Sequence, residues 1–95
     1  MRTSDTLTIR QRLVLYRAWH RGIREMDLIL GRFADAKIAQ FDDDALDAFE
    51  QFMELPDKEL FAWISGAIPV PAEQNTPLYR AVLEFHTAQP ETPSR

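Results

Sequence analysis

The sequence contains no cysteine, and this absence excludes disulfide bonds, thiolate metal sites and cysteine nucleophiles. It has no apolar run near the roughly 20 residues that a membrane-spanning helix needs. Only two histidines occur, His20 and His86, and neither belongs to a recognisable serine nucleophile motif. The glycine-rich fingerprint of dinucleotide-binding folds is also absent. We therefore predict a protein that is not an enzyme, is not inserted in a membrane, and holds neither a metal ion nor a permanent cofactor.

The 95 residues have a composition that is ordinary for one soluble domain, with 45% hydrophobic and 27% charged residues. The first ten residues lack the apolar core of a signal peptide, and Asp5 is atypical of a transit peptide. We therefore expect a bacterial, cytoplasmic protein. We also predict a flexible tail over residues 1–8, a helical domain over residues 9–88, and a disordered, proline-containing tail over residues 89–95.

Apolar residues recur every three or four positions through most of the chain, which is the period of an amphipathic helix. This period predicts helices near residues 9–20, 23–39, 45–55, 58–65 and 77–87. Helix starts are indicated by Thr8, by Asp42–Asp44 and by Thr76 with Pro77, and a helix stop by Gly66. The fold class that follows is all-α, a compact five-helix bundle in a single domain.

The same spacing predicts the apolar stripe of individual helices. In the first helix the stripe runs through Ile9, Leu13 and Tyr16 to Trp19 or His20. In the last helix it comprises Leu78, Ala81, Val82 and Phe85. Trp63 stands at helical spacing among apolar residues, so we assign it to the core rather than to a surface anchor. Gly31, inside the second helix, fits either a close helix crossing or simple tolerance of a glycine.

The stretch His20–Leu28 is the one place where charge, glycine and a helix end coincide. Gly22 lies at the junction of two helices, where a left-handed glycine can close the last turn of the first. Glu25 then falls in the first turn of the second helix, where its carboxylate meets the positive end of the dipole. Arg21 and Glu25 are four residues apart. Local physics is compatible with a structural corner carrying a surface ion pair, and equally with a rigid corner that presents its charges outward as a recognition surface.

The motif Arg-Gly-x-x-Glu within this stretch resembles the signature of the SdhE-type succinate dehydrogenase assembly factors, found in bacteria and mitochondria. The resemblance continues through Phe33, the segment Leu46 to Glu50, Asp57-Lys58-Glu59-Leu60, Trp63 and the terminal Leu83-Glu84-Phe85-His86. It thus covers roughly residues 9 to 87 in the expected order of segments. A bare motif of this kind would be weak evidence, but this order in a chain of this length is specific.

The resemblance implies a function and a site. Such a protein binds the flavoprotein subunit of succinate dehydrogenase, and of fumarate reductase, and promotes the covalent attachment of FAD to that client. Apart from the resemblance, we expect no permanently bound FAD, with a transient contact to the client's FAD still open, and we expect the free protein to be a monomer. Arg21, Gly22 and Glu25 match the motif, Asp27 matches its extension, and Arg24 and His20 adjoin it. By this resemblance Arg21 would donate forked hydrogen bonds to the client, Gly22 would admit its backbone, and Glu25 would orient Arg21 or accept from client donors.

A different class of function is suggested by the charges. Residues 1–40 hold eight Lys/Arg against four Asp/Glu, a net charge of +4, whereas residues 41–95 hold three against eleven, a net charge of −8. A row of arginines in the first half, Arg10, Arg12, Arg17, Arg21 and Arg24, would suit a small regulatory module, antitoxin-like or associated with nucleic acid. The overall charge of −4 and the acidic residues within the row favour the assembly factor, and we predict no nucleic-acid partner.

Overall fold

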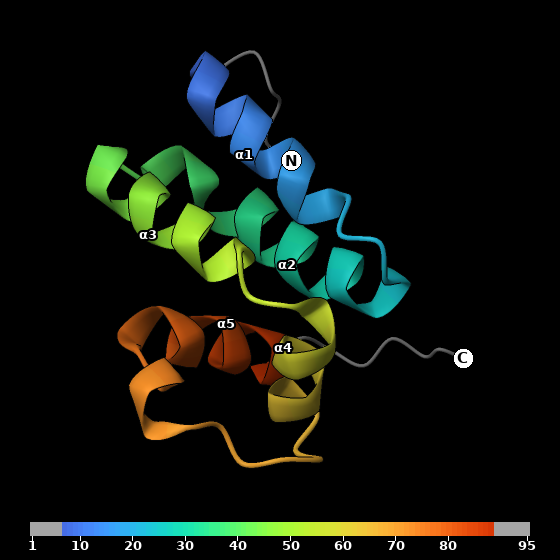
Figure 1. Ribbon diagram of the computed structural model, residues 1–95. Coiled ribbons are helices and arrows are strands. Elements are labelled where there is room, and N and C mark those ends of the chain that lie inside the picture. Colours follow the sequence, from blue (N-terminus) through green and yellow to red (C-terminus); the bar gives the residue numbers. More distant parts are fainter. Residues whose placement is uncertain (1–6, 89–95) are drawn as a thin grey trace.

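The computed structural model describes residues 7–88, and within this range the chain is helical and contains no strand (Figure 1). The helices are α1 (Ile9–Trp19), α2 (Arg24–Lys37), α3 (Asp43–Met53), α4 (Asp57–Ile64) and α5 (Pro77–Ala88), with short 3₁₀ helices η2 (Ile38–Gln40) and η3 (Ala72–Gln74). The predicted all-α class and the five helices are confirmed. Most of the two predicted tails, residues 1–6 and 89–95, lies outside the described residues. Leu7, assigned to the first tail, is instead buried.

The ends of the helices are fixed by the residues that the sequence indicates. The Thr8 side chain accepts a hydrogen bond from the Gln11 backbone N–H, and the Gln11 side chain accepts one from the Thr8 backbone N–H, which completes a capping box. The Asp42 carboxylate accepts from the backbone N–H of Ala45 at 2.9 Å and so caps α3. Gly66 follows α4 with a φ of 86°, a left-handed conformation that suits a glycine stop.

Helix α2 is the central element of the bundle, and it packs against α1, α4 and α5. In Figure 1, α1, α2 and α3 form one side of the molecule, and α4 and α5 lie across the other side. Phenylalanine rings join the two sides: Phe33 of α2 meets Phe49 of α3 at 5.9 Å and Phe85 of α5 at 5.8 Å, measured between ring centroids. Burying a side chain of this size contributes about 1.5–3 kcal/mol. Trp63 is partly buried and packs against this core, as predicted.

The crossing of α1 and α2 explains Gly31. Gly31 is buried, and a Cβ atom added to it would overlap the indole ring of Trp19. The Trp19 ring therefore lies directly on the backbone of α2, which only glycine allows. Of the two explanations that the sequence left open for this glycine, the close helix crossing is the one that the structure supports.

The predicted apolar stripe of α1 is wrong as a buried face except at its end, where Trp19 is partly buried against α2. Ile9, Leu13 and Tyr16 are 69%, 60% and 61% exposed, whereas Val14 and Ala18 on the opposite side are buried. The polar side chain of Gln11 is buried with them. Its Nε2 donates to the carbonyl oxygens of Ile38, at the end of α2, and Phe41, just after η2, at 3.1 and 3.2 Å. The same kind of correction applies to α5, where Ala81 is exposed and Tyr79 is buried.

Ion pairs between α1 and α3 show which face of α1 turns inward. Arg10 contacts Asp43, Asp47 and Glu50 of α3 at 3.5, 2.6 and 2.9 Å. Hydrogen bonds from this guanidinium to Asp47 and Glu50 raise the pKa of Arg10 above its usual value. Arg17, about two turns further along α1, lies 3.3 Å from Glu54, the residue that follows α3. The basic first half and the acidic second half of the chain thus attract one another within the molecule.

Candidate functional site

The corner, which we define as residues 20–27, joins α1 to α2 through a turn centred on Gly22. Gly22 has a φ of 104°, so the predicted left-handed glycine is confirmed. Residues that carry a side chain rarely adopt this backbone conformation. No atom lies within 4 Å of the position that a Cβ atom would take at Gly22. The backbone at Gly22 is therefore exposed and open to a partner, and a substitution there would cost backbone strain rather than a clash within the protein.

Arg21 points into the protein and holds the corner to the start of α4. Its Nε donates to the Asp57 carboxylate at 2.8 Å, and Nη2 lies 2.7 Å from the same oxygen. Nη2 also donates to the backbone carbonyl of Leu55 at 3.2 Å. The side chains of Arg21 and Asp57 are only 10% and 12% exposed, so this ion pair is nearly buried. The fork geometry uses the planar guanidinium in a way that a lysine could not reproduce.

Asp27 completes the inner half of the corner. Its carboxylate accepts a short hydrogen bond from the backbone N–H of Arg21, while its own backbone N–H donates to Ile23 at 2.9 Å. The expectation that Arg21 and Asp27 are presented outward therefore does not match the structure. Nor does Arg21 form the suggested surface ion pair with Glu25, because its guanidinium is engaged by Asp57.

The outer half of the corner consists of Gly22, His20, Arg24 and Glu25, all of which are exposed. The His20 ring stacks on Tyr16 with 3.9 Å between centroids, and its Nδ1 lies 2.7 Å from the carbonyl oxygen of that residue. Arg24 and Glu25 occupy the first turn of α2, where Glu25 is favoured by the helix dipole. The predicted site residues are thus gathered at one corner, but they face two ways.

Asp57 is the residue that sequence reasoning missed as a partner of the corner. The sequence places Asp57 only within the segment Asp57-Lys58-Glu59-Leu60 that resembles the family. In the structure it is the first residue of α4, directly after Pro56. No local pattern connects it with Arg21, which lies 36 residues earlier. The one feature of the sequence that could have drawn attention to Asp57 is its place directly after Pro56, in a segment that resembles the family.

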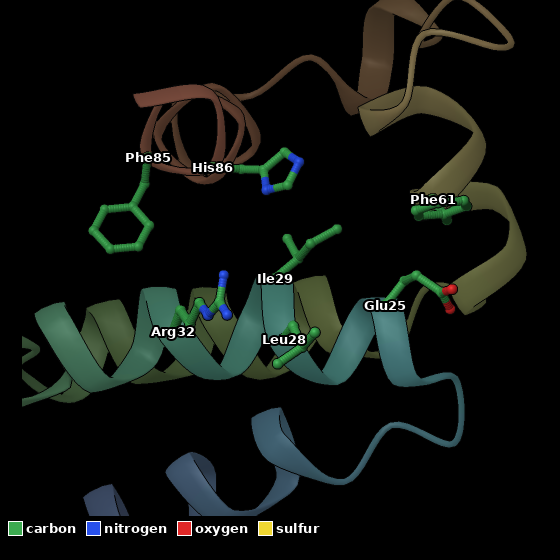
Figure 2. A pocket seen from close by; sticks show the side chains of 7 residues that line it. All are labelled: Glu25, Leu28, Ile29, Arg32, Phe61, Phe85 and His86. Carbon is green, nitrogen blue, oxygen red and sulfur yellow. The ribbon is translucent and has the colours of Figure 1, made fainter. Parts of the chain in front are cut away.

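A pocket adjoins the outer half of the corner (Figure 2). Its volume is about 170 Å³, and its apolar walls include Ile29 of α2, Phe61 of α4 and Phe85 of α5. Three polar side chains also line it, Glu25, Arg32 and His86, and Figure 2 shows the His86 ring pointing from α5 towards α2. Figure 2 shows α1 on the side of α2 away from this pocket. Glu25 therefore belongs both to the corner and to the pocket.

Comparison with known proteins identifies the family. The sequence profile of the family described as flavinator of succinate dehydrogenase matches residues 12–86. The chain is 38% identical over 80 residues to the FAD assembly factor SdhE of Acetobacter pasteurianus, an alignment that covers 84% of this chain and 73% of that protein. The chain belongs to this family. It is a family of assembly factors rather than of enzymes, as the sequence predicts.

Mitochondrial members of the family are similar over shorter parts of their length. The chain is 37% identical over 73 residues to succinate dehydrogenase assembly factor 2 of Aspergillus terreus, covering 77% of this chain and 23% of that protein. It is 33% identical over 79 residues to the protein of that name in Dictyostelium discoideum, covering 83% of this chain and 55% of the relative. No solved structure matches the chain significantly.

The arginine row of the alternative function is largely committed to contacts within the protein. Arg10 and Arg17 pair with carboxylates of α3, and Arg21 pairs with Asp57. Between residues 7 and 88, Arg12 and Arg24 are the members of the row that have no such partner. Binding to phosphates needs several free cations on one face, so the structure gives the nucleic-acid reading no support.

No helix within residues 7–88 combines the length and the apolar character that crossing a membrane requires.

Proposed function

We propose that this chain binds the flavoprotein subunit of succinate dehydrogenase and promotes the covalent attachment of FAD to that subunit, with the homologous subunit of fumarate reductase as a second client. Membership of the flavinator family supports the role of an assembly factor for succinate dehydrogenase. We assign the binding surface to the corner for one reason. The nearly buried ion pair of Arg21 and Asp57 fixes the turn, while Gly22, Arg24 and Glu25 remain exposed.

The two halves of the corner have different tasks in this proposal. Arg21 and Asp27 position the turn, and Gly22, Arg24, Glu25 and His20 contact the client. A turn held in this way loses little conformational freedom on binding, so more of the interaction energy appears as affinity. The assignment changes the role expected for Arg21, because a guanidinium already bonded to Asp57 and Leu55 is not free to grip a client carboxylate.

The chemistry of flavin attachment belongs to the client and its FAD, and this chain would act by positioning. Holding a client's domains so that its reacting groups meet can supply several kcal/mol of a barrier. The pocket beside the corner, at about 170 Å³, is smaller than the roughly 300–1,000 Å³ of cofactor pockets. A second hollow between α3 and α5 offers no charged side chain to a pyrophosphate. Neither hollow therefore suits permanent binding of FAD, and we propose that this chain meets FAD only transiently, on the client.

The test is covalent flavin content. The apo flavoprotein subunit of the same organism is mixed with FAD, with and without this protein, and in-gel flavin fluorescence is read over time. We expect an increase of at least about tenfold in rate, a size that proximity effects readily reach. The variant Glu25→Ala should lose most of it, while the matched Arg12→Ala, an exposed residue of α1, should keep it. The absence of any increase with the wild-type protein would refute the proposal.

A substitution at Gly22 can distinguish an effect on the stability of the turn from an effect on client binding. Asparagine tolerates a positive φ better than other side chains, so Gly22→Asn should cost no more than about 1 kcal/mol of unfolding free energy. Its side chain would nevertheless stand where we place the client backbone, and we expect binding to weaken at least about tenfold. Gly66→Asn is the matched control, because Gly66 has a φ of 86° and equally open surroundings away from the corner. Equal effects of the two changes on client binding would contradict this placement.

We also propose that the protein acts in the bacterial cytoplasm and is a monomer when free. The relative in Acetobacter pasteurianus is a bacterial assembly factor, which supports the first point. Sedimentation of the free protein over a range of concentrations tests the second. A mass that doubles with concentration would replace the monomer by a dimer.

A further inference from the structure

The pocket beside the corner is built like the receptor for a single side chain. Residues 25, 28, 29 and 32 line it from α2, and this spacing places them in one stripe along the helix. Phe61 closes one side from α4 although the residue is still 37% exposed, and α5 closes the other side with Phe85 and His86. The interior is therefore largely apolar and aromatic, with the His86 imidazole as its polar wall, and the exposed Glu25 lies at its edge.

The rim of the pocket carries charges of opposite sign at its two ends. Glu25 and Arg32 are both exposed, and neither has an ion-pair partner among the described residues. They are seven residues apart, about 10.5 Å along the helix axis, which is too far for them to pair with one another. A partner that fills the pocket can therefore place a carboxylate beside Arg32 without competing with an existing ion pair.

We propose that the pocket receives one aromatic side chain of the client, from a segment that also carries a carboxylate beside Arg32. This inference rests on the proposed function, because it adds a second anchor to the same binding surface. A volume of about 170 Å³ suits one ring, since apolar protein cavities of about 150 Å³ bind benzene. Aromatic residues seated in such pockets commonly dominate the energy of an interface. Glu25 makes the pocket continuous with the corner, so one client segment can reach both.

The chain itself offers few competitors for this place. Residues 89–95, which follow α5, contain no large apolar side chain. The exposed Tyr16 on α1 of a second molecule is the strongest alternative, because Ile9 and Leu13 would accompany it. That arrangement would make the protein associate with itself at rising concentration, and Tyr16→Ala would abolish the association.

The pocket can be tested without the client by using 3-phenylpropanoate, which combines one ring with a carboxylate. We expect it to bind the wild-type protein with a Kd of about 1 mM, as suits a ligand of this size. Methyl resonances of Ile29 should shift on titration. Arg32→Glu should weaken the binding at least about fivefold, whereas Arg12→Glu, on the far side of α2, should leave it unchanged. If the Ile29 resonances do not shift at probe concentrations well above the expected Kd, the proposal is overturned.

Binding of the flavoprotein subunit to pocket variants then tests whether the client uses the pocket. Leu28 is half-buried at the pocket, so Leu28→Trp fills it from the side without disturbing the core. We expect Leu28→Trp and Arg32→Glu each to weaken binding of the flavoprotein subunit at least about tenfold, with unchanged circular dichroism and with Arg12→Glu as control. If the wild type binds the client and both variants bind equally well, the pocket inference fails and the proposed function stands. If the wild type does not bind the client, the proposed function fails. Self-association that Tyr16→Ala abolishes would overturn the pocket inference in favour of a second copy.

Discussion

Removing either partner of the buried pair should unfold the corner rather than merely weaken a surface contact. Arg21 and Asp57 are about nine-tenths buried, and each is the other's charged partner. Losing one partner of a buried pair costs about 3–5 kcal/mol, because the remaining charge is left without compensation. Since both side chains keep some solvent contact, we expect about 3 kcal/mol for Arg21→Ala and a similar value for Asp57→Ala.

The effect should be large enough to measure directly. For a domain of this size, 1 kcal/mol corresponds to about 4–8 °C in Tm, so each variant should melt about 12–24 °C lower. Because the two residues act as one unit, the double variant should be destabilised by clearly less than the sum of the single variants, with a coupling of about 1–3 kcal/mol. Urea unfolding followed by circular dichroism provides all the required free energies.

A matched pair on the surface serves as the reference. Arg17 and Glu54 lie 3.3 Å apart, but their side chains are 45% and 73% exposed. An exposed pair contributes about 0–1 kcal/mol, so Arg17→Ala should change stability little. If Arg21→Ala were no more destabilising than Arg17→Ala, the idea that the buried pair fixes the corner would be refuted. The direct role of Arg21 in gripping the client would then return as the better explanation.

Three further predictions concern the scaffold. Gly31→Ala should destabilise by about 1–3 kcal/mol because the methyl group would displace the Trp19 indole ring; a gain in urea midpoint, as helix propensity alone predicts, would contradict the close crossing. Gln11→Met should cost about 2 kcal/mol because it removes the side-chain donor to the carbonyl oxygens of Ile38 and Phe41 and the side-chain acceptor of the Thr8 N–H, whereas the exposed Gln51→Met should be neutral in the same assay. Burial raises the pKa of Tyr79 above its ordinary 10.0, so the unfolded state loses this proton first and stability should fall as pH rises above about 10; Tyr79→Phe should remove that part of the slope in unfolding free energy measured against pH.

The helices and their ends were predictable because their causes are local. The Thr8 and Asp42 caps and the left-handed glycines at 22 and 66 depend on residues within a few positions. The family was predictable for a different reason, namely a specific motif embedded in an order of segments. These features need no knowledge of which helix packs on which.

The inward face of α1 was not predictable by the same means. This helix is apolar on two sides, and the stripe through Ile9, Leu13 and Tyr16 reads as the cleaner one because Gln11 interrupts the other. Gln11 is buried only because it satisfies backbone groups of the turn after α2, which are 27 and 30 residues away in sequence. The spacing of apolar residues distinguishes only polar from apolar positions. It cannot identify a polar side chain that is buried because its hydrogen-bond partners lie inside the fold.

The corner shows the same limit in its motif. A separation of four residues suggests an ion pair on one helix face, but that inference requires both residues to be helical. Arg21 lies before Ile23, the residue that precedes the first turn of α2, and Gly22 turns the chain between Arg21 and Glu25. The two side chains therefore leave the backbone in different directions, Arg21 towards Asp57 and Glu25 towards solvent and the pocket. Under the proposed function, the spacing of Arg-Gly-x-x-Glu therefore lets Arg21 fix the turn and leaves Glu25 for the client, because the positive φ of Gly22 separates the directions of the two side chains.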